Sequence, residues 1–149
     1  MNIPERLEND LKAAMKARDD MRTQVLRMIK SDLRYRQIEL GHELAEADVT
    51  AILSTAVKTR KEAMSEYVRG GRQDLADKES AEAKIVQGYL PEQLSTDELN
   101  RLVDKAIADT KAVTIKDLGS VMKVLMPEVR GRADGKAVNA AVRARLEGN

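Results

Sequence analysis

Apolar residues recur at three- and four-residue steps along most of the chain, which is the spacing of one face of an α-helix. Before residue 90 this pattern predicts four helices, which begin near Pro4, after Asp19-Asp20, near Asp48 and near Arg72. The clearest apolar stripe, on the third helix, contains Val49, Ile52, Leu53, Ala56, Val57, Met64, Tyr67 and Val68. No strand-like alternation continues beyond a few residues, so the pattern predicts an all-α fold.

The segment GYLPEQLS, residues 88–95, interrupts the helical pattern. Pro91 cannot continue a helix, and it restricts the backbone of Leu90 before it. Residues 95–98, STDE, then match the S-x-x-E capping box with which a new helix begins. We therefore expect a four-helix N-terminal domain at residues 1–90 and a three-helix C-terminal bundle at residues 91–149, with Pro91 as a structural residue between them.

Several helix ends can be assigned from single residues. Met15 is expected to continue the apolar stripe of the first helix, and Gly41 to end the second. In the C-terminal half, residues 114–117 resemble a capping pattern, and the helix that follows is expected to end at Pro127. Asp134, after the turn GRADG, is expected to cap the last helix.

The composition narrows the class of protein. The 149 residues include no Cys, Phe or Trp, so the cores must be built mainly from aliphatic side chains. Charged residues make up 34% of the chain but balance to a net charge of +1, which indicates solvated helix faces rather than disorder. Because no apolar stretch is long enough for a signal peptide or a membrane span, we expect a cytoplasmic protein without a membrane partner.

No set of residues suggests catalysis. The one histidine, His42, lies in a predicted turn beside Gly41, and no H-x-x-x-H or cysteine cluster offers a metal site. The chain also lacks a nucleophile elbow and a glycine-rich phosphate loop. We therefore predict no catalytic residue, no metal and no other cofactor.

Basic residues are concentrated near the C-terminus, where residues 111–149 contain eight bases and four acids. Arg130, Arg132 and Lys136 surround a glycine-bounded turn that leads into a helix, and guanidinium groups and backbone amides there could hold phosphate oxygens. The same charges would also keep an ordinary turn between two packed helices soluble. The sequence leaves both interpretations open.

A second basic face is predicted in the N-terminal half. Arg27, Lys30 and Arg34 recur at three- and four-residue steps on one helix, and Lys58 and Lys61 on the next helix can add to their field. Acidic residues are close in sequence, so a salt-bridged surface explains this face equally well.

Arg60 is unusual because it falls on the apolar face of the third helix. We expect a structural residue that extends its charged end to solvent or pairs with an acid of a neighbouring helix. A binding role for Arg60 is the alternative.

Two segments resemble the YqeY family, VLRMIKSDLRYRQIELG and VKTRKEAMSEYVRGGRQDLADKESAEAKIVQGYLPEQLS. A third is similar to the helical tail of the B subunit of tRNA-dependent aspartyl/glutamyl amidotransferase (GatB), DLGSVMKVLMPEVRGRADGKAVNAAVRARL. Together they cover essentially the whole chain, and the resemblance implies a two-domain all-helical protein.

The resemblance also implies a function. In the amidotransferase the tail is implied to contact tRNA, whereas the chemistry resides in a catalytic domain that has no counterpart here. The implied partner is tRNA or a tRNA-processing complex, with Lys123, Arg130, Arg132 and Lys136 as RNA contacts. The family label of carbon–nitrogen ligase with glutamine as amido donor then belongs to the larger enzyme, and this chain is an accessory protein. The alternative is a protein-interaction module without an RNA role, which would use exposed apolar strips on the fourth helix.

Overall fold

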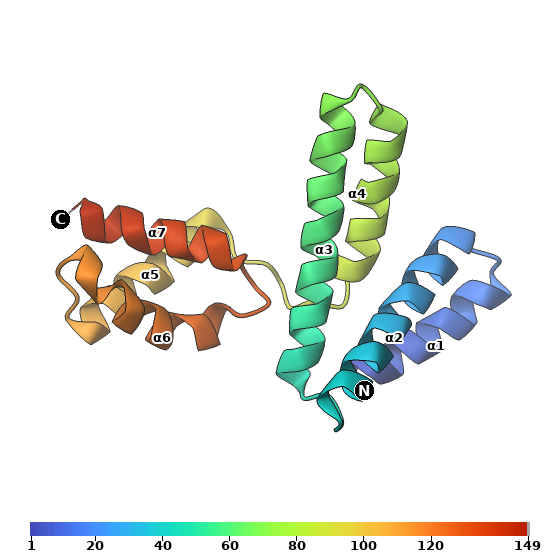
Figure 1. The fold of residues 1–149 in the computed structure, drawn as a ribbon, viewed down its shortest axis with the longest axis horizontal. Helices are drawn as coiled ribbons and strands as arrows, with labels where there is room; N and C mark the ends of the chain where they lie inside the picture. Colours follow the sequence, from blue (N-terminus) through green and yellow to red (C-terminus); the bar gives the residue numbers. More distant parts are fainter. Residues whose placement is uncertain (149) are drawn as a thin grey trace. The chain divides into compact units, whose positions relative to one another are not determined.

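The computed structural model describes residues 1–148, which form seven α-helices, one short 3-10 helix and no strand (Figure 1). The elements are α1 (Ile3–Lys16), α2 (Asp20–Leu40), α3 (Glu46–Arg69), α4 (Gln73–Gln87), α5 (Thr96–Thr110), η1 (Ile115–Asp117), α6 (Leu118–Val129) and α7 (Gly135–Glu147). The predicted all-α class is confirmed. Contacts group the chain into two compact units, Met1–Leu90 (unit 1) and Pro91–Asn149 (unit 2).

Unit 1 consists of two helical hairpins, α1 with α2 and α3 with α4, and α3 packs most extensively on α4 (Figure 1). Its core is aliphatic apart from one tyrosine. The buried cluster is Leu7, Leu11, Val25, Leu26, Ile29, Leu33, Val49, Leu53, Ala56, Val57, Val86 and Tyr89. Each large side chain of this kind stabilises the fold by about 1.5–3 kcal/mol relative to full exposure.

The helix ends of unit 1 follow local capping rules. Gly41 ends α2 as predicted, in the left-handed conformation that glycine adopts without a Cβ clash (φ 76°). The third helix begins at Glu46, two residues before Asp48 and near the predicted position. Asp48 is the third helical residue, and its carboxylate accepts a hydrogen bond from the Ala45 amide at 3.0 Å. An acid at the third helical position accepts a hydrogen bond from the amide of the residue before the helix, so it lies inside the first turn and is not the cap residue itself.

Two residues placed on apolar stripes by the sequence are in fact exposed. Met15 is 49% exposed, because eight residues after Leu7 it lies roughly 80° further around α1 at 3.6 residues per turn. Ala14 occupies the buried position instead. Val68, in the last turn of α3, is 52% exposed. These two predictions are wrong because the stripe was extended by spacing alone.

Unit 2 packs α5, α6 and α7 around a separate core of Leu99, Val103, Ala106, Val121, Leu125, Val129, Val138, Val142 and Leu146. The predicted capping box begins α5, where the Ser95 hydroxyl accepts from the Glu98 amide at 3.1 Å. Just before it, the Leu94 amide donates to the Arg132 carbonyl at 2.8 Å, and the Gln93 side chain donates to the Gly131 carbonyl at 2.8 Å. Residues 93–94 are therefore fixed to the turn between α6 and α7.

Pro127 does not end α6, contrary to the prediction. The helix continues to Val129, although proline cannot donate a hydrogen bond to the carbonyl of Lys123 one turn earlier. Lys123 and Pro127 are both exposed, so water can satisfy that carbonyl. Val129 is fully buried and the Arg130 amide donates to the Met126 carbonyl at 2.9 Å, so packing holds the last turn.

The short η1 helix shows the capping pattern expected at residues 114–117. The Asp117 carboxylate accepts hydrogen bonds from the amides of Val113 at 2.8 Å and Thr114 at 3.0 Å. These two donors favour the charged form, and they lower the pKa of Asp117 below its usual value. The carboxylate therefore fixes the start of the α6 segment.

Replacing Asp117 with Asn should lower the melting temperature of unit 2 at neutral pH, because the neutral amide is a weaker acceptor for the two backbone donors. Because folding lowers the pKa of Asp117, its carboxylate stabilises the folded state fully at pH values above the unfolded-state pKa. This stabilisation is lost as the pH falls through the folded-state pKa. The difference in melting temperature between the two proteins should thus shrink between roughly pH 5 and pH 2. Thermal melts followed by circular dichroism across this range test it, and a difference independent of pH would contradict it.

Candidate nucleic-acid interface

The turn between α6 and α7 has a fixed conformation. Val129 and Val138 anchor its two sides in the core of unit 2. Between them Gly131 adopts the left-handed conformation (φ 78°), and the amides of Arg132 and Ala133 both donate to the Val129 carbonyl, at 2.8 and 3.1 Å. The side chains carried by this turn are therefore presented by a defined backbone rather than by an open loop.

Three cations gather on this turn and on the first residues of α7. Arg130 and Lys136 are exposed, and Arg132 is half-buried, with its Nε donating to the Glu92 carbonyl at 3.4 Å. Within residues 1–148 none of the three forms an ion pair. Their charge is consequently available to an anion from outside the chain.

The start of α7 adds backbone donors to these cations. Asp134 occupies the predicted cap position, but its side chain makes no capping hydrogen bond, so the prediction is correct in position and wrong in contact. The first amides of a helix have no acceptor within the helix, and they carry a partial positive charge. Such a helix end, flanked by Arg132 and Lys136, suits a phosphate oxygen.

Sequence reasoning missed Arg101. Arg101 of α5 and Arg132 line one shallow depression of about 290 Å³, whose other residues are Leu94, Glu98 and Leu102. The two arginines are far apart in the sequence, and only the packing of α5 against the 93–94 segment and the α6–α7 turn brings them together. The polar face of α5 was the one available signal, and by itself it does not distinguish Arg101 from other surface residues.

Lys123 lies on α6, two helical turns before Arg130, and is exposed. Like the three cations of the turn, it forms no ion pair in the part of the chain that the structure describes. The structure thus groups Arg130, Arg132 and Lys136 at one turn and leaves Lys123 as a separate charge on a neighbouring helix.

The second basic face is partly neutralised. Lys30 pairs with Glu8 of α1 at 2.6 Å, and this hydrogen bond lowers the pKa of Glu8. Arg27 donates to the Met15 sulfur at 3.9 Å. The remaining members of this face, Arg34, Lys58 and Lys61, are exposed and unpaired within residues 1–148.

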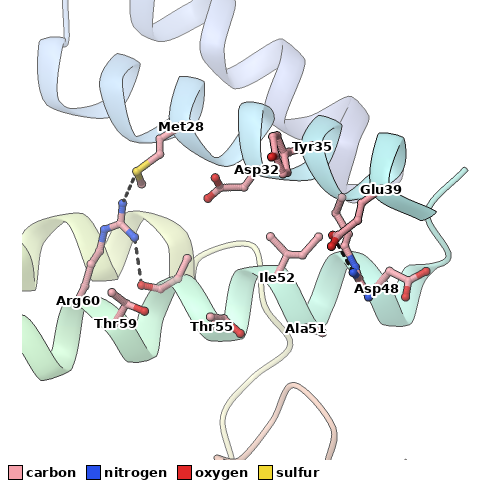
Figure 2. Close-up of a pocket in the computed structure, with 12 residues that line it drawn as sticks. Met28, Asp32, Tyr35, Glu39, Asp48, Ala51, Ile52, Thr55, Thr59 and Arg60 are labelled. Atoms are coloured by element: carbon pink, nitrogen blue, oxygen red, sulfur yellow. Dashed lines mark hydrogen bonds and ion pairs between the residues drawn. The ribbon is translucent and has the colours of Figure 1, made fainter. Parts of the chain in front are cut away.

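Arg60 lies in the interior of unit 1, with 7% of its surface exposed (Figure 2). One terminal nitrogen donates to the Ala56 carbonyl at 3.0 Å and the other to the Met28 sulfur of α2 at 3.5 Å. Its Nε lies 3.5 Å from a carboxylate oxygen of Glu82 on α4, but without hydrogen-bond alignment to any described residue. Arg60 therefore connects three helices.

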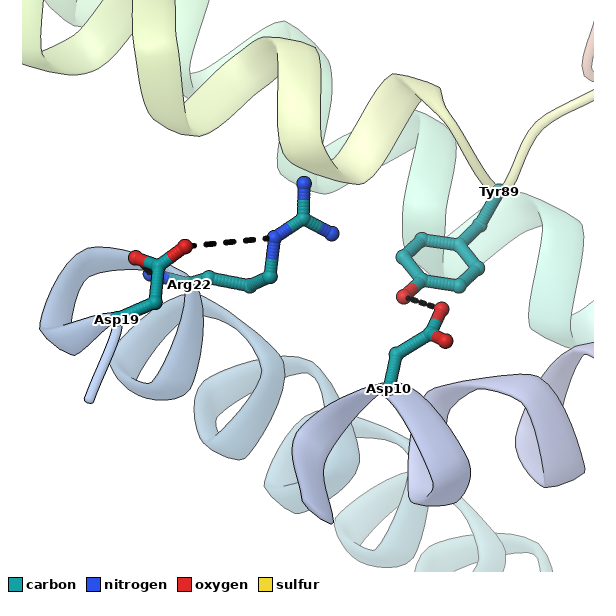
Figure 3. A network of polar contacts seen from close by, with 4 residues as sticks. All are labelled: Asp10, Asp19, Arg22 and Tyr89. Atoms are coloured by element: carbon teal, nitrogen blue, oxygen red, sulfur yellow. Dashed lines mark hydrogen bonds and ion pairs between the residues drawn. The ribbon is translucent and has the colours of Figure 1, made fainter. Parts of the chain in front are cut away.

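A second polar contact joins α1 to the residues after α4. The buried Tyr89 hydroxyl donates to the Asp10 carboxylate, near the Arg22–Asp19 pair (Figure 3). Burial raises the pKa of Tyr89, and the hydrogen bond to Asp10 raises it further. The Arg6 guanidinium lies 5.0 Å from the centroid of the Tyr89 ring, within cation–π range.

Pro91 follows this anchor and is exposed. Its peptide bond is trans, since residues 1–148 contain no cis peptide. The Pro91 carbonyl accepts from the Gln93 side chain at 3.2 Å. The residues before Pro91 thus belong to the packing of unit 1, and those after it bond within unit 2.

The exposed apolar strips expected on α4 are absent from the described chain. Ala76, Ala83 and Val86 of α4 are buried, because this helix packs along α3. The helix with the most exposed large apolar side chains is instead α2, with Met21, Met28, Tyr35 and Ile38. The prediction for the fourth helix is therefore wrong.

Neither a metal site nor a membrane span is found in residues 1–148. No group of three or more His, Cys, Asp or Glu side chains is placed to hold a metal ion. His42 is an exposed loop residue whose Nδ1 lies 2.8 Å from the Glu43 carbonyl. None of the described helices is both long and apolar enough to cross a bilayer.

A family model described as Yqey-like protein matches residues 4–146. The chain belongs to the YqeY family. This confirms the resemblance seen in the sequence, and the match extends across both units and includes the basic turn.

Three yeast relatives of this YqeY-family chain share the name "Altered inheritance of mitochondria protein 41, mitochondrial". The protein of Vanderwaltozyma polyspora is 33% identical over 121 residues, which are 76% of this chain and 65% of that protein. That of Lachancea thermotolerans is 33% identical over 85 residues, which are 56% of this chain and 46% of that protein. That of Kluyveromyces lactis is 28% identical over 142 residues, which are 93% of this chain and 72% of that protein. The chain thus spans less than two thirds of the length of the first two relatives.

The expected cytoplasmic location is contradicted by these relatives, whose names describe them as mitochondrial. That expectation rested on the absence of a long apolar stretch, and the absence of cysteine agrees with it as well. Both features argue only against secretion and membrane insertion, and they do not distinguish one remaining compartment from another.

Replacing Arg60 with Ala should lower the free energy of unfolding of unit 1 by about 2–3 kcal/mol, because it removes a buried side chain and leaves Glu82 without its ion pair. The double replacement Arg60→Met and Glu82→Gln keeps the volume and removes both charges, and it should stay within about 1 kcal/mol of the wild type. Urea unfolding followed by circular dichroism measures both. An Arg60→Ala variant as stable as the wild type would contradict the assigned structural role.

Proposed function

We propose that this YqeY-family chain is a tRNA-binding accessory protein that contacts the RNA backbone through the turn between α6 and α7. The observation that carries the proposal is the grouping of Arg130, Arg132 and Lys136 at the uncapped start of α7, without an ion pair in residues 1–148. Guanidinium forks, a lysine and free helix amides are the groups that bind phosphate oxygens. Lys123 and Arg101 would extend the same contact.

The chemistry of unit 2 indicates how RNA would be read. All three tyrosines precede residue 91, and the chain has no Phe or Trp, so unit 2 offers no aromatic ring for base stacking. Binding must then come from phosphate contacts and from the shape of a folded RNA. Such binding is modest in affinity and sensitive to salt.

The similarity of residues 117–146 to the tail of GatB supports tRNA as the class of RNA. By the same argument, any carbon–nitrogen ligase activity with glutamine as donor would belong to a tRNA-processing complex to which the chain contributes binding. The chain itself would supply no catalytic group.

We also propose that residues 1–90 and 91–149 are separate domains, of four and three helices, that fold independently. Two separate clusters of buried residues support this division, one within each unit. The hydrogen bonds on the two sides of Pro91 support it as well, because each set stays within its own unit.

Reversing two charges of the turn, Arg130→Glu with Lys136→Glu, should weaken the binding of folded tRNA about tenfold or more at low salt, since it replaces attraction to phosphate with repulsion. Arg132 is left in place because it also donates to the Glu92 carbonyl. For the wild type, three phosphate contacts should lower affinity about tenfold or more between roughly 50 and 200 mM salt. Filter binding with radiolabelled tRNA measures both effects.

The matched control is Lys12→Glu with Lys78→Glu, which makes the same change in net charge at two exposed lysines of unit 1. Its affinity should stay within about twofold of the wild type if the contact is local. Absence of tRNA binding at low salt would refute the RNA proposal. An unaffected Arg130/Lys136 variant would exclude this turn as the contact.

The domain proposal predicts that residues 1–90 and 91–149, produced separately, are each helical and each unfold cooperatively. Their circular dichroism spectra should add to that of the intact chain, and residues 91–149 alone should retain tRNA binding. A piece of about 60 residues is near the lower limit for independent folding, so its cooperative melt is an informative result. An unfolded fragment on either side would show that the boundary after Leu90 is not a domain boundary.

A further inference from the structure

An open groove runs between α2 and α3 in unit 1, with a volume of about 570 Å³ (Figure 2). On the α2 side it is lined by Met28, Asp32, Tyr35, Arg36 and Glu39, and all but Arg36 follow each other at steps of four, three and four residues. This set is distinct from the buried stripe of α2, which faces the core. The helix therefore has a second face, which lines the groove and which no other residue of unit 1 covers.

The α3 side is lined by Asp48, Ala51, Ile52, Thr55, Ala56, Thr59 and Arg60. Four of these residues, Asp48, Ile52, Thr55 and Thr59, repeat the same spacing. Steps of three and four residues place each set on one face of its helix. Two neighbouring helices thus present mixed polar and apolar faces to an open space that no third helix of unit 1 lines. We propose that this groove binds an amphipathic, basic α-helix of a partner protein.

The dimensions of the groove fit one short helix. The lining residues extend over positions 28–39 of α2 and 48–59 of α3. At 1.5 Å per residue each wall is about 17 Å long, which corresponds to about three helical turns. A helix of that length presents apolar anchors at positions i, i+4 and i+7, and this is the usual mode of recognition in a groove between two helices.

The side chains of the groove combine apolar contact with negative charge. Tyr35 is 75% exposed and stands at the α2 wall, Met28 is partly exposed, and Ile52 lies half-buried on the opposite wall (Figure 2). An exposed tyrosine offers a large contact area and a hydrogen-bonding hydroxyl, as is common in protein interfaces. These residues would contact the apolar face of the incoming helix.

The charges of the groove favour a basic partner. Glu39 is paired with Arg36 at 2.8 Å, and the Arg60 guanidinium is held near Glu82. The two arginines of the lining, Arg36 and Arg60, are thus both paired, whereas Asp32 forms no ion pair with any described residue. A second copy of the chain would bring the same unpaired acid against itself, and a nucleic acid would add phosphates to it. A partner helix that carries lysine or arginine beside its apolar face would attract Asp32 and avoid both kinds of repulsion.

The experiment places a photo-crosslinking phenylalanine analogue at Tyr35 of the full-length chain in its native cells, followed by mass spectrometry of the adducts. The matched control places it at Ile38, which is 70% exposed on α2 but does not line the groove. We expect position 35 to give a nuclease-resistant adduct with a segment that has apolar residues at helical spacing and at least two basic residues. Position 38 should give about fivefold less of it or none.

Charge reversal at the groove tests the stated chemistry. Asp32→Lys should lower the adduct yield at position 35 about fivefold, whereas Glu43→Lys, an exposed acid outside the groove, should leave it unchanged. Circular dichroism checks that both variants fold. Equal yields at positions 35 and 38, adducts to a second copy of the chain, to RNA or to an acidic segment, or an unaffected Asp32→Lys variant would each overturn the proposal, which does not depend on the RNA-binding turn.

Discussion

A buried guanidinium lies where three helices of unit 1 meet. An arginine with 7% of its surface exposed needs a compensating partner, because a buried charge left without one costs several kcal/mol. Arg60 finds its carboxylate on α4, at Glu82, and this requires α4 to lie along α3 at that level. From α2 it receives only the thioether of Met28, a weak acceptor. The charge of Arg60 is therefore offset from α4, whereas its contact with α2 is to a weak neutral acceptor. The open groove between α2 and α3 lies beside this asymmetric contact.

Local signals in the sequence were sufficient for the helices, because each signal acts within a few residues. The Ser95–Glu98 box and Gly41 both set a helix end where the sequence placed it. Pro127 was misread because its effect on the backbone was weighed without the packing of Val129, which tertiary structure alone reveals. Sequence signals are equally limited to local groupings when they are used to predict binding sites. Arg130, Arg132 and Lys136 are close in sequence, whereas Arg101 joins them only through helix packing. The sequence did not predict the groove, because its α2 wall mixes Asp32 and Glu39 with Met28 and Tyr35. Such a wall has no hydrophobic periodicity that could be detected.

The balanced composition conceals two surfaces of opposite character. A net charge of +1 over 149 residues suggests a neutral protein. Yet the α6–α7 turn presents cations without ion pairs in residues 1–148, and the α2–α3 groove retains an uncompensated aspartate. Exposed charges farther apart than about 8–10 Å are largely screened at physiological salt, so each surface is recognised by its local groups rather than by the total. A neutral total therefore says little about what either surface binds.

The two proposed surfaces would also respond differently to salt. Phosphate contacts release counterions, so affinity at the turn falls steeply as salt rises. Contact at the groove includes Met28, Tyr35 and Ile52, and burial of such apolar surface is not weakened by salt. Rising salt would therefore release the RNA before the protein.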